Sequence, residues 1–142
     1  MFMQEMLEIL KLLSDESRLR ILMLLEKKEL CVCQIMGVLN ISQPLVSRNL
    51  SLLAKAGFLK DRREGKLMFY SVKKKLPLKH NLVLSVLKEA LKNDKVALKD
   101  AASLKDCEEF QKITGKCGME TFRAYIEHKE KMKRRQKSVV GI

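Results

Sequence analysis

Two cysteines separated by a single residue, Cys31 and Cys33, are the side chains most able to do chemistry in this sequence. Thiolates are good ligands for soft, thiophilic ions. Residues i and i+2 of an ideal helix point about 200° apart, so a helical pair can share one ion only if the helix unwinds locally. A nearby helix start would also lower the thiol pKa through the helix dipole. The competing interpretation is two buried, small hydrophobic residues.

Few other side chains are available to complete such a site. As(III), Sb(III), Cd(II) and Pb(II) prefer three or four sulfur ligands, and the remaining candidates are Cys107 and Cys117, between which the sequence does not choose. Met36 carries a thioether but is expected to pack in the core. His80 has no second His at helical spacing, which disfavours a zinc site on its helix, and His128 is expected on the surface.

The thiols are not accompanied by a set of residues typical of an enzyme. The sequence has no Cys-x-x-Cys redox motif, no Gly-rich phosphate loop and no cluster of His and acidic residues. With no visible signal peptide or membrane span, we expect a cytoplasmic protein whose cysteines are reduced and ligate metal rather than form disulfides. We therefore predict a binding protein that is not an enzyme and uses no organic cofactor.

The sequence around the cysteines predicts a helix-turn-helix, which would position them. A short helix from Cys31 breaks at Asn40, and a second opens at Ser42, with Pro44 in its first turn and Gly57 at its end. An apolar stripe is predicted at Leu45, Val46, Leu50 and Leu53. The opposite face is polar and partly basic, as expected for a major-groove reader: Gln43, Ser47, Arg48, Ser51 and Lys55. Ser42 joins this set as a candidate DNA contact.

A β-hairpin is predicted next, from two alternating apolar runs joined through Glu64-Gly65. It carries Arg62, Arg63 and Lys66 around the turn, which suits a wing laid against phosphates or a minor groove. The formal net charge of the chain is +12. Residues 29–75 contain nine basic and three acidic residues, a net of +6, so the charge is concentrated where the motif needs it.

Amphipathic helices flank this unit on both sides. Residues 1–13 form one, Ser14-Asp15 caps a second that should be the centre of the core, and residues 78–93 form the last domain helix. The first and last helices carry apolar stripes that can pair across a two-fold axis in a homodimer. The predicted fold is mainly α with one β-hairpin: a winged helix-turn-helix domain over residues 1–94 plus a C-terminal helical extension over residues 95–142.

The extension carries two cysteines and a basic tail. Gly115 and Gly118 separate two weakly amphipathic segments, and residues 131–137 form the tail. We expect the tail to be a solvated end, with additional phosphate contact as the alternative.

From about Leu7 to Val72 the chain resembles the ArsR/SmtB family of winged-helix metalloregulators. The resemblance rests on Leu-Ser-Asp-Glu-Ser-Arg-Leu-Arg-Ile-Leu, Glu-Leu-Cys-Val-Cys, Ser-Gln-Pro-x-x-Ser-Arg and Arg-Arg-Glu-Gly-Lys, in that order and at the family spacing. Met36 stands where arsenic repressors commonly have a third Cys, and Asn49 replaces a frequent His on the reading helix. The resemblance implies a homodimer that binds double-stranded operator DNA.

The expected function is a transcriptional repressor that leaves its operator when As(III), Sb(III) or another thiophilic ion binds at Cys31 and Cys33. The alternatives are a Cd(II)- or Pb(II)-responsive repressor and a thiol-based redox sensor on the same scaffold. A chelating dithiol without oxidant would reset a metal response, whereas a reductant alone would reset a redox response.

Overall fold

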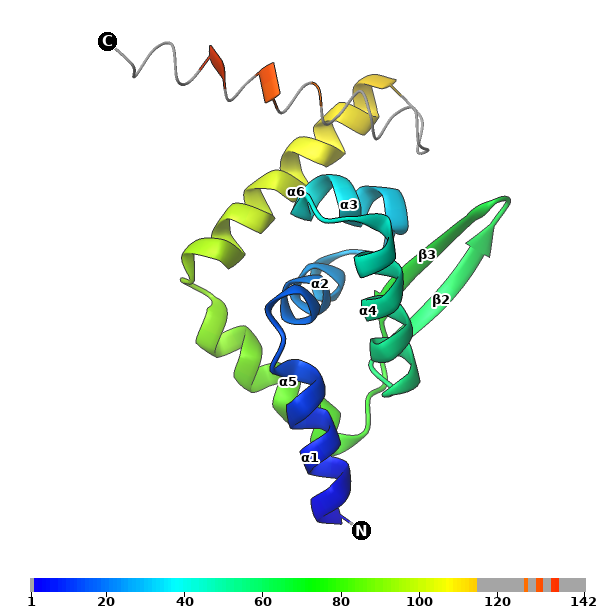
Figure 1. Cartoon of the computed structure of the whole chain (residues 1–142), viewed down its shortest axis with the longest axis vertical. Helices are drawn as coiled ribbons and strands as arrows, with labels where there is room; N and C mark the ends of the chain where they lie inside the picture. Colours follow the sequence, from blue (N-terminus) through cyan, green and yellow to red (C-terminus); the bar gives the residue numbers. More distant parts are fainter. Residues whose placement is uncertain (1, 115–126, 128–129, 132–133, 136–142) are drawn as a thin grey trace.

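The computed structural model describes residues 2–114, 127, 130–131 and 134–135. In chain order its elements are α1 (Phe2–Leu13), α2 (Glu16–Lys27), β1 (Leu30–Cys31), α3 (Val32–Leu39), α4 (Gln43–Lys55), β2 (Leu59–Glu64), β3 (Leu67–Val72), α5 (Leu78–Leu91) and α6 (Lys95–Thr114). Figure 1 shows α3 and α4 joined by a short turn, with the β2–β3 hairpin projecting beside them. The predicted winged helix-turn-helix is confirmed.

Helix α2 is the centre of the core, as its sequence predicts. It starts at the N-cap Asp15, whose carboxylate accepts the Arg18 backbone N–H at 3.0 Å. Its apolar residues then face in several directions and pack against α1, α3, α4 and α6. Four of them are at most 2% exposed: Ile21, Leu22, Leu24 and Leu25.

The turn between α3 and α4 is set by local chemistry. Helix α3 ends at Leu39 because Asn40 adopts the left-handed conformation, with φ 56°, which an Asn side chain tolerates. The Ser42 hydroxyl accepts the Leu45 N–H at 3.4 Å and so caps α4. At the far end Gly57 has φ 93° and turns the chain into β2. Asn40 and Ser42 therefore fix where α3 ends and where α4 begins.

The sheet has three antiparallel strands in the order β1-β3-β2, where the sequence predicts only a hairpin. The hairpin register pairs Arg62 with Phe69 and Glu64 with Leu67, and Gly65 turns the chain with φ 61°. The additional strand β1 pairs Leu30 with Tyr70 and Cys31 with Phe69. The start of α3 is therefore attached directly to the wing.

The two flanking helices lie next to each other, and Lys79 of α5 forms an ion pair with Glu5 of α1. Both expose large apolar side chains, as the sequence predicts. On α1 these are Phe2, Met3, Leu7 and Leu10, and on α5 they are Leu78, Leu82 and Val86. None of the described helices is both long and apolar enough to cross a membrane.

Helix α6 packs against α2 and α3, and Figure 1 shows it passing beside α3. It buries Leu104 and Cys107, each 6% exposed, in the main core. Cys117, His128 and most of the basic tail lie outside the described residues.

Candidate functional site

The exposed face of α4 carries the side chains predicted to read DNA. Ser42, Gln43, Ser47, Arg48, Ser51 and Lys55 are all exposed. Val46, Leu50 and Leu53 are buried at 1% exposure or less, as predicted. One assignment on this helix is wrong, because Leu45 is 38% exposed; Asn49, which the sequence pattern assigns to neither face, is 3% exposed. Leu45 therefore belongs to the outer face, whereas Asn49 points into the protein and is not part of the reading surface.

The hairpin carries three exposed cations, Arg62, Arg63 and Lys66. Neighbouring residues of a strand point to opposite faces, so Arg62 and Arg63 project on opposite sides of the hairpin. Among the described residues, no acidic side chain forms an ion pair with Arg63 or Lys66. Their charges are therefore available to a polyanion.

Arg62 is held by acidic neighbours in the same chain. Its guanidinium lies 2.7 Å from the Glu29 carboxylate and 2.9 Å from that of Glu64, and it stacks over the Phe69 ring at 4.8 Å. The hydrogen bonds that Arg62 donates to Glu29 and Glu64 raise the pKa of Arg62, and the bond that Glu29 accepts lowers the pKa of Glu29. Because two carboxylates already neutralise it, Arg62 is less available to phosphates than Arg63.

Cys31 lies between the wing and the support helix. It is the last residue of β1 and the N-cap of α3, with extended backbone angles of φ −90° and ψ 168°. It forms a reciprocal capping box with Gln34, whose side-chain oxygen accepts the Cys31 backbone N–H at 2.8 Å. The prediction that Cys31 is helical is wrong, because pairing with Phe69 keeps it extended. Only Cys33 lies within α3.

The two thiols differ in exposure. Cys31 is 1% exposed, whereas Cys33 is partly exposed. Burial, followed by the neighbouring Cys31, raises the pKa of the Cys33 thiol. The prediction of a lowered pKa is wrong here, because the cost of desolvating a thiolate exceeds the stabilisation available at the helix start. Cys33 is therefore the more accessible of these two thiols.

Helix α6 places Cys107 on the face that meets α3. One turn before it, the Ser103 hydroxyl donates to the Val38 carbonyl at 3.0 Å; one turn after it, Gln111 accepts from the Gln34 side chain at 2.9 Å. Residues four apart share a helix face, so Cys107 lies between these two contacts. Within the described residues, no three His, Cys, Asp or Glu side chains are grouped closely enough to hold a metal ion.

His80 and Met36 are both buried and pack against other residues of the protein. His80 is 7% exposed, its Nε2 donates to the Ala56 carbonyl at 2.8 Å, and its ring packs on Phe58 with centroids 4.7 Å apart. Met36 is 7% exposed in the hydrophobic core, as predicted. Sequence reasoning did not identify Gln34, although Cys-Val-Cys-Gln has the spacing of a capping box with a thiol in place of the usual hydroxyl.

The helix-turn-helix segment matches a known family. The model of bacterial regulatory proteins of the arsR family matches residues 15–61. A 66-residue segment is 46% identical to an uncharacterized HTH-type transcriptional regulator of Methanocaldococcus jannaschii, and it covers 46% of this chain and 74% of that protein. The chain belongs to the arsR family. The family and this relative are described as transcriptional regulators.

Other relatives carry names that refer to arsenic. The arsR-family chain is 44% identical over 72 residues to the arsenical resistance operon repressor of Escherichia coli, a match that covers 50% of this chain and 62% of that repressor. The match thus spans less than two thirds of that relative. Among solved structures, reduced HlyU from Vibrio cholerae is similar, with a TM-score of 0.54, 26% identity and coverage of 61% of this chain and 88% of HlyU. The family model ends before β3, so α6 and Cys107 lie outside it.

Proposed function

We propose that this arsR-family protein is a DNA-binding transcriptional repressor that leaves its operator when a thiophilic ion binds at Cys31 and Cys33. Helix α4 would enter the major groove through its exposed polar face, and the hairpin would lie against the adjacent backbone. The net charge of +6 in residues 29–75 favours this polyanionic partner. The arsenic relatives support a soft ion as the signal.

One observation carries the proposal: Cys31 belongs both to the strand that pairs with the wing and to the cap of the helix that supports α4. Because the Cys31 side chain is buried, an ion that draws both thiols together must disturb the capping box, the β1–β3 pairing or both. Either change alters the support of a DNA-facing element. Metal and DNA then favour different shapes of the protein, with a typical coupling of about 1–3 kcal/mol.

The proposed inducer is As(III) or Sb(III), which bind three thiolates. Cys31 and Cys33 supply two sulfur atoms. Cys107 is proposed as the third ligand because α6 holds it against α3, whose N-cap is Cys31 and whose first turn contains Cys33. Cys117 and two-coordinate binding are the alternatives. Cd(II) and Pb(II), which also select sulfur-rich sites, are the alternative inducers.

A homodimer is proposed through the outer faces of α1 and α5. The exposed apolar side chains of these helices include Phe2 at 83% and Leu78 at 73% exposure, and they would leave water at a two-fold interface. The α4 helices of the two protomers would then bind two half-sites of an operator.

The test is to titrate arsenite, antimonite, cadmium and lead into the complex of the protein with a labelled duplex, enriched by the protein from a randomised library. We expect arsenite or antimonite to release the duplex, and a chelating dithiol to restore binding without an oxidant. Release by cadmium or lead alone would select the alternative inducers. Release only by an oxidant, reversed by reductant alone, would replace the metal mechanism with a redox mechanism.

The identity of the third ligand is tested by comparing the variants Cys107→Ser and Cys117→Ser. We expect Cys107→Ser to weaken arsenite binding and to reduce the arsenic–sulfur coordination number measured by X-ray absorption. Unchanged affinity in Cys107→Ser, with a loss in Cys117→Ser, would assign the ligand to Cys117. Unchanged affinity in both variants and in the double variant would leave a two-coordinate site.

A further inference from the structure

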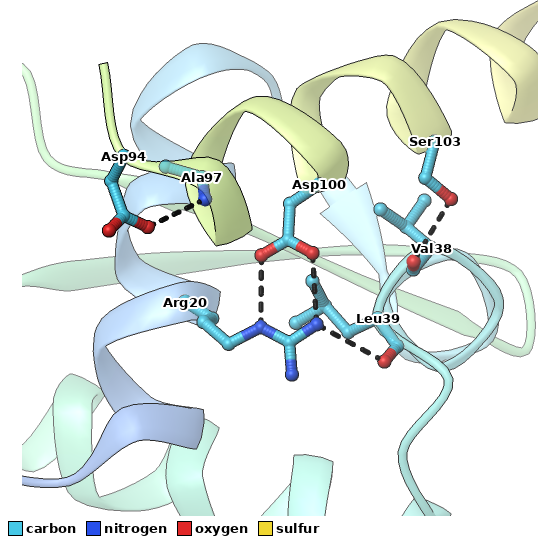
Figure 2. A network of polar contacts seen from close by, with 7 residues as sticks. All are labelled: Arg20, Val38, Leu39, Asp94, Ala97, Asp100 and Ser103. Carbon is cyan, nitrogen blue, oxygen red and sulfur yellow. Dashed lines mark hydrogen bonds and ion pairs between the residues drawn. The ribbon is translucent and has the colours of Figure 1, made fainter. Parts of the chain in front are cut away.

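Helix α6 is attached to both helices that support the reading helix. Three of its residues, at steps of three and eight, make polar contacts along one face: Asp100 with Arg20 of α2, Ser103 with the Val38 carbonyl of α3, and Gln111 with Gln34 of α3. Figure 2 shows the first two of these contacts, with Asp100 and Ser103 projecting from the same side of α6. Helix α6 therefore spans α2 and α3.

The Arg20–Asp100 contact is the strongest of the three. The Arg20 guanidinium donates through Nε at 3.0 Å and through Nη2 at 2.9 Å to the two oxygens of Asp100. Asp100 is 7% exposed, and the Arg20 side chain is 25% exposed. Paired, charge-assisted bonds of this kind fix both the distance and the orientation of the groups they join.

The same guanidinium reaches the end of α3. Arg20 Nη2 also donates to the Leu39 carbonyl at 3.4 Å, and Figure 2 shows this contact beside the pair with Asp100. Leu39 is the last residue of α3, so its carbonyl is one of the groups that a helix end leaves without an internal partner. A cation at this end is also favoured by the helix dipole. Three residues later Ser42 caps α4.

We propose that Arg20 and Asp100 are positioning residues for DNA recognition, and that α6 acts through them as a brace on the turn between α3 and α4. Asp100 orients Arg20, Arg20 holds the end of α3, and the held turn fixes the direction of α4. The brace rests on the proposed function, but its effect on the turn does not depend on DNA. Helix α6 is outside the family model, which ends at residue 61.

The test compares Asp100→Asn with Asp106→Asn, which changes an exposed carboxylate on the same helix. The probe is the labelled duplex that the wild-type protein enriches from a randomised library. We expect Asp100→Asn to bind it about tenfold more weakly at a temperature where both variants are folded, while Asp106→Asn binds like the wild type. We also expect faster amide hydrogen exchange in residues 40–45 of Asp100→Asn only. Binding within twofold of the control, together with unchanged exchange, would overturn the proposal.

A second variant separates positioning from stability. Arg20→Met with Asp100→Leu replaces the ion pair by apolar side chains, which often preserves stability but leaves no donor for the Leu39 carbonyl. We expect its thermal midpoint to stay near that of the wild type while DNA binding stays weak. Recovery of both properties would show that only packing matters and would overturn the brace. If the wild type enriches no duplex, the proposed function fails, and exchange in residues 40–45 alone decides whether the brace exists.

Discussion

The two arginines of the wing should contribute differently to DNA binding, although they are adjacent in the sequence. Each phosphate neutralised by a cation contributes about 0.9 to the slope of log affinity against log salt. Arg63 has no acidic partner among the described residues, so Arg63→Ala should lower that slope by about 0.9 per protomer. The ratio of wild-type to Arg63→Ala affinity should then fall about 3.5-fold between roughly 50 and 200 mM salt, because a slope difference of about 0.9 acts over a fourfold rise in salt concentration.

Arg62→Ala should leave the slope nearly unchanged. Arg62 is already paired with Glu29 and Glu64. Removing it therefore takes away little free positive charge, and it leaves two carboxylates without their cation near the DNA phosphates. Glu29→Gln provides the matched control, because it removes one of these partners while keeping Arg62. We expect Glu29→Gln to steepen the slope. Fluorescence anisotropy of the labelled duplex at several salt concentrations measures all three variants, and equal slope losses for Arg62→Ala and Arg63→Ala would refute the reasoning.

Further predictions concern the thiols, the reading helix and its end. Cys31→Ser and Cys33→Ser should each bind the duplex like the wild type but resist release by arsenite; release at the wild-type arsenite concentration would contradict this. Arg48→Ala should lose about 1–3 kcal/mol on the selected duplex with relaxed sequence preference, and equal losses on random DNA would exclude a reading role. Gly57→Ala should lower the unfolding free energy in urea by about 1–2 kcal/mol, because its φ of 93° strains any Cβ. Alkylation of Cys33 should have its midpoint at higher pH in the folded than in the unfolded chain, since burial raises its pKa.

The ends of α3 and α4 were predictable because their signals are local. Asn40, Ser42 and Gly57 act on neighbouring backbone groups, and each does so in the structure. Strand β1 was not predictable in this way. It has two residues, and its partner β3 lies about forty positions further along the chain, so no periodicity marks it.

Side-chain environments were predicted less well than helix ends. The contact between Arg20 and Asp100 spans 80 positions and requires α6 to fold back over α2, which no local pattern encodes. Leu45 is exposed and Asn49 is buried because the buried stripe of α4 is set by how the helix packs on the rest of the domain, not by hydrophobicity alone. The pKa of Cys33 similarly depends on burial, which the helix-dipole argument did not include.

Two of the hydrogen bonds between α3 and α6 use groups that do not ionise. Gln34 accepts the Cys31 backbone N–H through its oxygen and donates to Gln111 through its nitrogen, and Ser103 donates to a backbone carbonyl. Amides and hydroxyls keep the same hydrogen-bonding capacity throughout the pH range in which imidazoles and carboxylates titrate. These two hydrogen bonds, beside the thiols, should therefore persist in both mildly acidic and mildly alkaline cells.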